Sequence, residues 1–485
     1  MRQRGSPKLP LAALLLFVVL GSTLVFSPPP VFASAGCGSV IKTNTVLRAN
    51  IGPCPGNGLV IGANHITLDC AGHTIAGTDK DAGINLTGMT RVTVENCYVT
   101  GFRYGFLLTS SSGSILTEDT ASGNDFGFYL DSSSNGNGLA KDTASGNFYG
   151  FLLTGSSDNA ITGNVADNDY YYGFYLSSYS SKNTITGNSA NSDLYGFYLY
   201  ESSGNALKGN TASSNHYYGF ALGSSSGDTL TGNAGNNDVE YGFVLYSLSN
   251  STLTGNRAKS DSDGFYLYES SGNTLGGNTA SSNHYYGFYL GSSSNGNTLR
   301  GNTAIDNNYD GFALVGSSDN SISRNTAYEN GFGFLLTGSS GNSLSWDTAR
   351  SNSNGFALTG SSGNVLSTDT ALGNVYGFDL GISSNNTLTG NTASSNSYYG
   401  LLLTNSSRNT LSRNTAVWND YGFALTGSSR NVLSKNTANS NYLYGYDDGS
   451  TGSGTLGTAN FYASNTCRGN GAGGSSPNGL GTPQP

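Results

Sequence analysis

The sequence predicts an all-β protein, a right-handed parallel β-helix solenoid of about 17 or more coils with 22–24 residues each. The first observation is a glycine, within YGF or an equivalent triplet, that recurs 17 times between positions 83 and 445 at intervals of 22–24 residues. The second is a 27-residue segment, Tyr200–Ser226, that returns at Tyr268–Ser294 with three differences. Random low-complexity sequence would not keep this register, so the chain is a repeat protein.

Each repeat reads G-F-x-L-x-x-S-S-x-N-x-L-x-G-N-T-A-x-x-N-x-x-Y and accounts for one coil. The Phe and Leu of GFxL alternate with a variable residue, which is strand periodicity with Phe and Leu turned inward. A second short strand carries an apolar residue such as Ile161 or Leu207, and a third carries the Ala of TA. No segment after residue 35 offers competing helical spacing. Right-handed winding follows from the general handedness of parallel crossovers.

Two asparagine columns recur at fixed places in the repeat. Asn tolerates left-handed backbone at tight turns, and stacked amides can hydrogen-bond along a solenoid. We interpret both columns as structural ladders, with sugar binding by the same amides as the alternative. The first contains Asn159, Asn183, Asn205, Asn250, Asn273, Asn320 and Asn342; the second contains Asn164, Asn188, Asn210, Asn233, Asn256, Asn278, Asn302 and Asn325.

The chain is acidic, with a net charge of -9 and 21 Lys and Arg residues. This composition lacks the basic face that nucleic-acid binding requires. We expect a signal peptide at 1–35, an N-terminal cap and first coils at 36–82, and repeats at 83–450. A C-terminal cap at 451–468 and a disordered Gly/Ser/Pro-rich tail at 469–485 would follow.

Residues 1–35 have the features of an export signal: a basic start, an apolar run over 9–26 and the small-residue cleavage site Ala33-Ser34-Ala35. We expect cleavage, after which no segment would span a membrane. A retained membrane anchor and a lipoprotein acylated at Cys37 are the alternatives. The predicted location is secreted, periplasmic or at the cell surface.

Five cysteines in an exported chain indicate disulfides. We expect Cys37 and Cys54 to form one that closes the cap, because their 17-residue separation brackets a return containing Gly and Pro. Cys70 shares the strand parity of neighbouring apolar residues, which predicts a buried thiol. The partners of Cys97 and Cys467 stay open.

From Cys37 onward the sequence resembles secreted right-handed parallel β-helix proteins of the pectin-lyase-like group, which includes the NosD-type periplasmic proteins. The resemblance rests on Cys37–Gly77, on VTVENCYVTGFRYGFLL at Val92–Leu108, and on the repeated GFxLxxSSxNxLxxNxAxxN. It implies the fold but not the activity, because this architecture serves lyases, hydrolases, epimerases and adhesins. A copper role such as that associated with NosD would lack ligands in a chain with four His and two Met.

Enzymes of this fold that act on acidic polysaccharides need several carboxylates on neighbouring coils. The outward position of GFxL carries one Asp, Asp379, among Leu, Tyr, Ala and Val. We therefore predict no catalytic residues and lean toward a non-catalytic protein. A polysaccharide lyase, hydrolase or epimerase is the alternative.

Two pairs of Asp replace Asn in adjacent coils: Asp119 with Asp142, and Asp347 with Asp369. Stacked carboxylates repel unless they are protonated or bridged, so calcium is one interpretation. A solvated turn with Lys141 nearby is the interpretation we favour. We predict no cofactor and no metal site.

A group of tyrosines alternates with the inward Phe and Leu, so its members should point outward from one sheet. Exposed aromatic patches usually bind a partner, and we predict that this strip binds carbohydrate. The column of Tyr directly before the marker Gly is instead expected to be structural, because its stacked rings would cover one another. The predicted binding residues are Tyr175, Tyr198, Tyr200, Tyr246, Tyr266, Tyr268 and Tyr289.

The sequence therefore favours an exported, non-catalytic, monomeric β-helix protein whose partner is a polysaccharide or a cell-envelope glycan. A purely structural surface rod is the remaining alternative. Ala221, Gly223 and Gly291 interrupt the strip. We expect these gaps to leave some tyrosine ring faces open.

Overall fold

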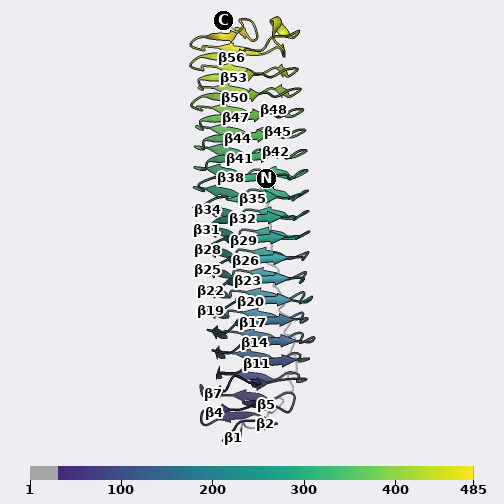
Figure 1. Cartoon of the computed structure of the whole chain (residues 1–485), viewed down its shortest axis with the longest axis vertical. Coiled ribbons are helices and arrows are strands. Elements are labelled where there is room, and N and C mark those ends of the chain that lie inside the picture. Colours follow the sequence, from purple (N-terminus) through teal and green to yellow (C-terminus); the bar gives the residue numbers. More distant parts are fainter. Residues whose placement is uncertain (1–30, 484–485) are drawn as a thin grey trace, which may run out of the picture.

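The computed structural model describes residues 31–483, which form an all-β solenoid of about 18 turns. Three parallel sheets of 20 strands each run along it, and pairing proceeds from each coil to the next. Figure 1 shows the coils stacked into a straight rod, from β1 and β2 at one end to β56 near the other. Within the described residues, the one helical element is the 3-10 turn η1 (Thr455–Gly457). The predicted fold class is confirmed.

Sheet A begins with β1 (Val31–Ala33) and β3 (Thr45–Leu47) and then takes every third strand from β6 (Thr67–Asp69) to β57 (Phe461–Ala463). Sheet C begins with β4 (Ile51–Cys54) and β7 (Thr74–Gly77), takes every third strand from β10 (Tyr98–Thr100) to β58 (Thr466–Arg468), and ends with β60 (Thr482–Pro483). Sheet B carries the GFxL strands and contains β2 (Ser39–Ile41), β5 (Leu59–Ile61), β8 (Ala82–Asn85), β11 (Tyr104–Thr109), β14 (Phe126–Asp131), β17 (Tyr149–Thr154), β20 (Tyr172–Ser177), β23 (Tyr195–Tyr200), β26 (Tyr218–Gly223), β29 (Tyr241–Tyr246), β32 (Asp263–Tyr268), β35 (Phe288–Gly291), β38 (Asp310–Val315), β41 (Phe332–Thr337), β44 (Asn354–Thr359), β47 (Tyr376–Gly381), β50 (Tyr399–Thr404), β53 (Tyr421–Thr426), β56 (Tyr444–Asp448) and β59 (Gly473–Ser476).

The core is a set of columns in which each coil repeats the side chain of the coil before it. Phe174 and Phe197 stack with ring centroids 4.7 Å apart and planes 4° apart, and stacked Phe pairs continue from Phe106 to Phe378. The Leu of GFxL, the apolar residue of sheet A and the Ala of sheet C are equally buried. The inward pattern predicted from the repeat is confirmed.

Asparagines hold the turns between the sheets. The backbone N–H and Nδ2 of Asn188 both donate to Oδ1 of Asn210, at 2.9 and 3.0 Å, and Nδ2 also donates to the carbonyl of Ile161 at 2.9 Å. Each amide thus links three consecutive coils and satisfies turn backbone that would otherwise be buried unpaired. The ladder interpretation is confirmed, except that exposed Asn250 is not a member and buried Ser251 takes its place.

A third column, which the sequence analysis did not single out, lies at the turn from sheet C to sheet B. It contains Asn147, Asp169 and Asp193, among others, and they form the same bonds. A Cβ atom placed on Gly173 would lie 2.5 Å from Asp193 Oδ2, and one on Gly196 would lie 2.9 Å from Asn215 Nδ2. An Asp therefore puts Oδ2 where an Asn puts its donating nitrogen.

Most ladder aspartates lack a partner for that second oxygen. Because the surrounding atoms are those that accept from an Asn amide, only a protonated carboxyl can donate there. Burial raises the pKa of Asp169 to about 7, and burial together with repulsion from Asp169 raises the pKa of Asp193 to about 9. The buried, unpartnered Oδ2 atoms belong to Asp119, Asp142, Asp169, Asp193, Asp228, Asp238, Asp261 and Asp369.

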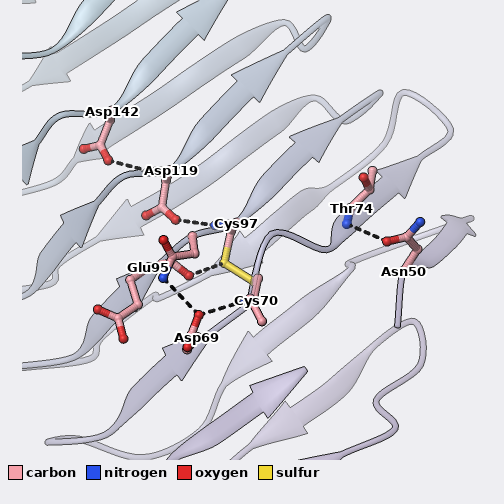
Figure 2. The surroundings of a disulfide bond; sticks show 10 residues. Asn50, Asp69, Cys70, Thr74, Glu95, Cys97, Asp119 and Asp142 are labelled. Atoms are coloured by element: carbon pink, nitrogen blue, oxygen red, sulfur yellow. Dashed lines mark hydrogen bonds between the residues drawn. A yellow bond between two sulfur atoms is a disulfide. The ribbon is translucent and has the colours of Figure 1, made fainter. Parts of the chain in front are cut away.

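Two disulfides secure the first coils. Cys37 and Cys54 are bonded, as predicted, with Cα atoms 5.3 Å apart. The expectation of a buried Cys70 thiol is wrong, because Cys70 is bonded to Cys97 with Cα atoms 4.7 Å apart. Cys70 does point inward, but Cys97 lies at the matching corner of the next coil (Figure 2), where Cys97 N–H donates to Asp119 Oδ1 at 2.8 Å. Cys467 is unpaired and buried.

The C-terminal end of the chain differs from the expected tail, and the N-terminal end is described only from residue 31. Residues 1–30 of the expected signal peptide lie outside the described residues, and Val31–Ala33 forms β1, which pairs with β3. The tail expected to be disordered instead contains β59 and β60, because pairing with β56 and β58 gives its backbone hydrogen-bond partners despite a Gly-rich sequence. The expected C-terminal cap contains η1, β57 and β58, and the two strands continue sheets A and C.

Removal of the second disulfide should destabilise the N-terminal coils. The double substitution Cys70→Ala and Cys97→Ala should lower the free energy of unfolding by about 3 kcal/mol, because the bridge restricts the unfolded chain. Urea unfolding of the variant and its parent would measure the loss. Non-reducing peptide mapping should recover both bridges, with Cys467 alkylated only after unfolding; alkylation of native Cys70 would contradict the assignment.

The ladder acids should make the protein less stable as pH rises. Their folded-state pKa values lie above the ordinary value of 3.8, so the native state binds more protons than the unfolded state, and stability should fall from about pH 4 to about pH 9. The double substitution Asp169→Asn and Asp193→Asn should restore amide donors and raise stability at pH 8 by about 1–3 kcal/mol per site, with less gain at pH 5. Unfolding at the two pH values would measure this, with exposed Asp158→Asn as the control. An equal gain at both pH values would show that these carboxyls are not protonated in the fold.

Candidate functional site

The outer face of sheet B carries three columns of outward side chains along most of the rod. The first directly precedes the marker Gly, the second lies between the inward Phe and Leu, and the third follows that Leu. The seven tyrosines predicted to bind carbohydrate lie in the second and third columns of β20, β23, β29, β32 and β35. We call these seven residues the tyrosine strip.

The structure places every strip residue on the outside of the rod. Tyr198 is half-buried between Phe197 and Leu199, which are fully buried. The other strip residues are also half-buried except Tyr268, which is 41% exposed. The orientation expected from strand alternation is therefore observed.

The gaps in the strip are occupied by neighbouring rings, contrary to the expectation that they stay open. Tyr246 lies over Gly223, since a Cβ atom there would be 1.9 Å from its ring. The Tyr246 hydroxyl meets that of Tyr198 at 2.5 Å, and Ala221 in the coil between is fully buried. Small residues let neighbouring rings lean across the gap. The result is a close-packed aromatic surface in which rings of neighbouring coils contact one another.

The same leaning occurs at the other end of the strip. Tyr289 lies over Gly291, where a Cβ atom would be 2.4 Å from its ring. Tyr289 also stacks on Tyr266 with centroids 4.7 Å apart and planes 9° apart. These two rings form one aromatic ledge, with Tyr268 beside it on β32.

The first column is part of the same surface, although the sequence assigned it to the scaffold. Tyr172 stacks on the strip residue Tyr175 with centroids 4.6 Å apart. Tyr241 contacts Tyr266 at 4.8 Å, and Tyr218 contacts Tyr241 at 5.3 Å. Ring contacts thus join the two ends of the strip through the column before the marker Gly.

The hydroxyls of Tyr175, Tyr246 and Tyr266 are neutral at ordinary pH. Burial raises the pKa of Tyr175 and Tyr246, and it raises the pKa of Tyr266 to about 12. Each hydroxyl can therefore both donate and accept a hydrogen bond at ordinary pH. The combination of apolar rings and neutral hydroxyls suits a ligand with apolar C–H faces and many hydroxyls.

Two carboxyls in the first column were not singled out from the sequence. Asp263 is 7% exposed and accepts a hydrogen bond from Tyr286 N–H at 3.1 Å, while Asp310 is 4% exposed. Burial raises the pKa of each to about 6. The break in the Tyr column at these two positions is the signal that could have found them. Asp263 therefore caps the N–H of Tyr286, and Asp310 accepts a hydrogen bond from the backbone of Phe332.

Exposed aromatics at the turn from sheet C to sheet B were also missed. Their signal is an aromatic residue two positions before the marker Gly, as in the YYG, FYG and YDG triplets, with Tyr170 one position further upstream. The exposed rings here are Phe148, Tyr170, Tyr171, Tyr285, Tyr309 and Tyr398.

Metal binding has little support in the part of the chain that the structure describes. Across residues 31–483, no three His, Cys, Asp or Glu side chains come together as a group that could hold a metal ion. Asp119 and Asp142 are 1% and 0% exposed, so the favoured interpretation of a solvated turn is wrong. Lys141 instead pairs with Glu118 at 3.0 Å. The ladder oxygens point inward and do not offer the six to eight ligands that calcium takes.

No helix in the described residues has the length and apolar character needed to cross a membrane.

Solved structures similar to this chain include a mutant of the periplasmic alginate epimerase AlgG, at 15% identity and a TM-score of 0.34, covering 61% of this chain and 78% of that chain. The Azotobacter vinelandii mannuronan C-5 epimerase AlgE4 A-module has 14% identity and a TM-score of 0.33, covering 79% and 86%. The Dettilon tailspike protein has 15% identity and a TM-score of 0.32, covering 62% and 59%. No curated protein sequence matches significantly.

A family described as "Periplasmic copper-binding protein (NosD)" matches residues 64–240, 224–346 and 337–470. The periplasmic location in that description agrees with the secreted, periplasmic or cell-surface location predicted from the sequence. The copper does not fit the donors described above, since the described residues bring no cluster of His or Cys together and the unpaired thiol is buried. The matches cover most of the repeats, and this chain therefore belongs to the NosD family of parallel β-helix proteins.

Proposed function

We propose that this protein is an exported, non-catalytic β-helix protein that binds a polysaccharide or cell-envelope glycan on the outer face of sheet B. The observation that carries the proposal is the continuous aromatic surface joining Tyr175 to Tyr289 through the rings of the first column. A surface of this kind, larger than scattered single residues, is typical of a binding face.

The chemistry of the surface supports a carbohydrate ligand. Sugar rings present apolar C–H faces that can lie against aromatic rings, and their hydroxyls can bond to the neutral tyrosine hydroxyls. Because the rings of the strip pack against one another, they are held in place before binding. A preorganised surface loses less side-chain entropy when it takes a ligand.

Substitution of the strip should abolish this binding. The variant Tyr198→Ser, Tyr200→Ser, Tyr266→Ser and Tyr268→Ser should weaken retention at least about tenfold in affinity electrophoresis on whichever polysaccharide retains the parent. Tyr442→Ser, at a tyrosine that is 75% exposed and lies outside the strip, is the matched control. If the folded four-site variant were retained as strongly as the parent, the strip would have a structural role and no role in binding.

The purified protein should not turn over uronans. The strip brings no exposed pair of carboxyls together, and the buried Asp263 and Asp310 are engaged with backbone, so incubation with polygalacturonate or alginate should yield no unsaturated or epimerised product, with or without calcium. Ultraviolet absorbance and proton NMR would detect such products. Product formation that Asp263→Asn abolishes would replace the binding proposal with an enzymatic one.

A further inference from the structure

An open groove of about 780 Å³ lies at the turn from sheet C to sheet B, near the N-terminal end of the rod. Its walls come from the loop between β7 and β8 and from the turns that lead into β14, β17 and β20. The groove is separate from the tyrosine strip, and its size is that of a small-ligand site. Asp79, Asp125, Phe148, Tyr170 and Tyr171 supply its functional side chains. We call it the turn groove.

Glycine holds one corner of the coil at Gly101, Gly123 and Gly146, in three consecutive coils, whereas most other coils carry a side chain there. Gly123 and Gly146 have φ of 64° and 66°. The conformation does not demand glycine, since Trp418 holds the same corner at φ 57° and is 66% exposed. A Cβ atom on Gly146 would meet nothing within 4 Å. These glycines therefore leave open the space that a side chain fills elsewhere.

Three aromatic rings form one wall of the turn groove. Tyr170 is 62% exposed, Phe148 46% and Tyr171 38%. Tyr170 lies edge-on to Phe148 and to Tyr171, with centroids 5.5 and 4.7 Å apart. Tyr170 and Phe148 are more exposed than any residue of the strip, of which Tyr268 is the most exposed at 41%. Exposed aromatic rings offer apolar surface suited to the C–H faces of a sugar.

Carboxylates supply the polar part of the turn groove. Exposed Asp79 and half-buried Asp125 both line it, and neither Lys, Arg nor His is among its lining residues. An ionised carboxylate accepts hydrogen bonds and donates none. The hydroxyls of a neutral sugar would satisfy these oxygens, whereas the carboxylate of a uronate would be repelled by them.

We infer that the turn groove is a subsite for a neutral glycan, with a sugar ring packed on Phe148, Tyr170 and Tyr171 and its hydroxyls bonded to Asp79 and Asp125. Ring contacts connect this subsite to the strip: Tyr171 contacts Tyr149 at 5.8 Å and Tyr172 at 6.5 Å, and Tyr172 stacks on Tyr175. The inference rests on the proposed function, because the groove would hold one end of the chain that the strip binds. The carboxylates of the groove thus favour neutral polysaccharides over uronans as the ligand class.

Filling the turn groove tests the inference. The substitution Gly146→Trp places in it the side chain that Trp418 carries at the same corner. Gly373→Trp is the matched control, since Gly373 has φ 65°, nothing within 4 Å of its Cβ position, and lies outside the groove. Affinity electrophoresis would use hydroxyethyl cellulose, xylan and galactomannan as neutral probes and polygalacturonate and alginate as anionic probes.

We expect a neutral probe to retain the parent and Gly373→Trp equally, with retention of Gly146→Trp weakened at least about tenfold. Tyr170→Ser and Asp125→Asn should each weaken the same retention, which keeps the test valid should Gly146→Trp fail to fold. Retention that the four-site strip variant loses and all three groove variants keep would overturn this inference and leave the proposed function intact. Retention by the anionic probes alone would overturn the neutral-glycan assignment. Absence of retention by every probe would overturn both.

Discussion

The structure depends on the register between neighbouring coils. Hydrogen bonding between parallel strands fixes their separation at about 4.8 Å, and every other contact is compatible with that spacing. The centroids of stacked phenylalanine rings are 4.7 Å apart. This distance is close to the strand separation and also suits the packing of aromatic rings. The Asn amides repeat the same spacing at the turns, where strand pairing stops. Each coil is therefore held by its neighbours at the core and at its corners, and the structure propagates along one dimension.

A register fixed from within leaves the outer columns free to vary. The corner before the third Asn column shows this, since Gly146, Ser192 and Trp418 occupy it with the same left-handed backbone. A change at such a position alters the surface of one coil while the ladder bonds of that coil persist. Binding surfaces on this fold can therefore be assembled from local substitutions. The outer columns of sheet B carry few charged residues and many clustered aromatic rings, and the core does not dictate either feature.

The positions of residues that recur in every repeat could be predicted from the sequence. The positions of residues that depend on a local difference between two neighbouring coils could not. The alternation of Phe197, Tyr198 and Leu199 was enough to assign inward and outward positions. The position of the Tyr246 ring depends on Gly223 in the coil before it. Strand alternation predicts which face a side chain lies on but not the conformation of that side chain. Predicting the Cys70–Cys97 bridge would have required the register between the first coils, and those coils do not follow the regular repeat. The tail was mistaken for disorder because its strand pairing depends on backbone contacts with the last coil rather than on its own composition.

The ladders also explain why the turn groove can be a defined site although it lies on turns. Its rings directly follow ladder residues, Phe148 after Asn147 and Tyr170 after Asp169. Asn147 N–H and Nδ2 both donate to Asp169 Oδ1, at 2.8 and 2.9 Å, and Tyr170 N–H donates to the carbonyl of Asn147 at 2.7 Å. The backbone that carries the rings is thus fixed by buried hydrogen bonds on both sides. Surface turns usually lose conformational entropy when they bind, whereas these turns have already lost it through folding. The same interaction that sets the coil register therefore preorganises the surface that would meet the ligand.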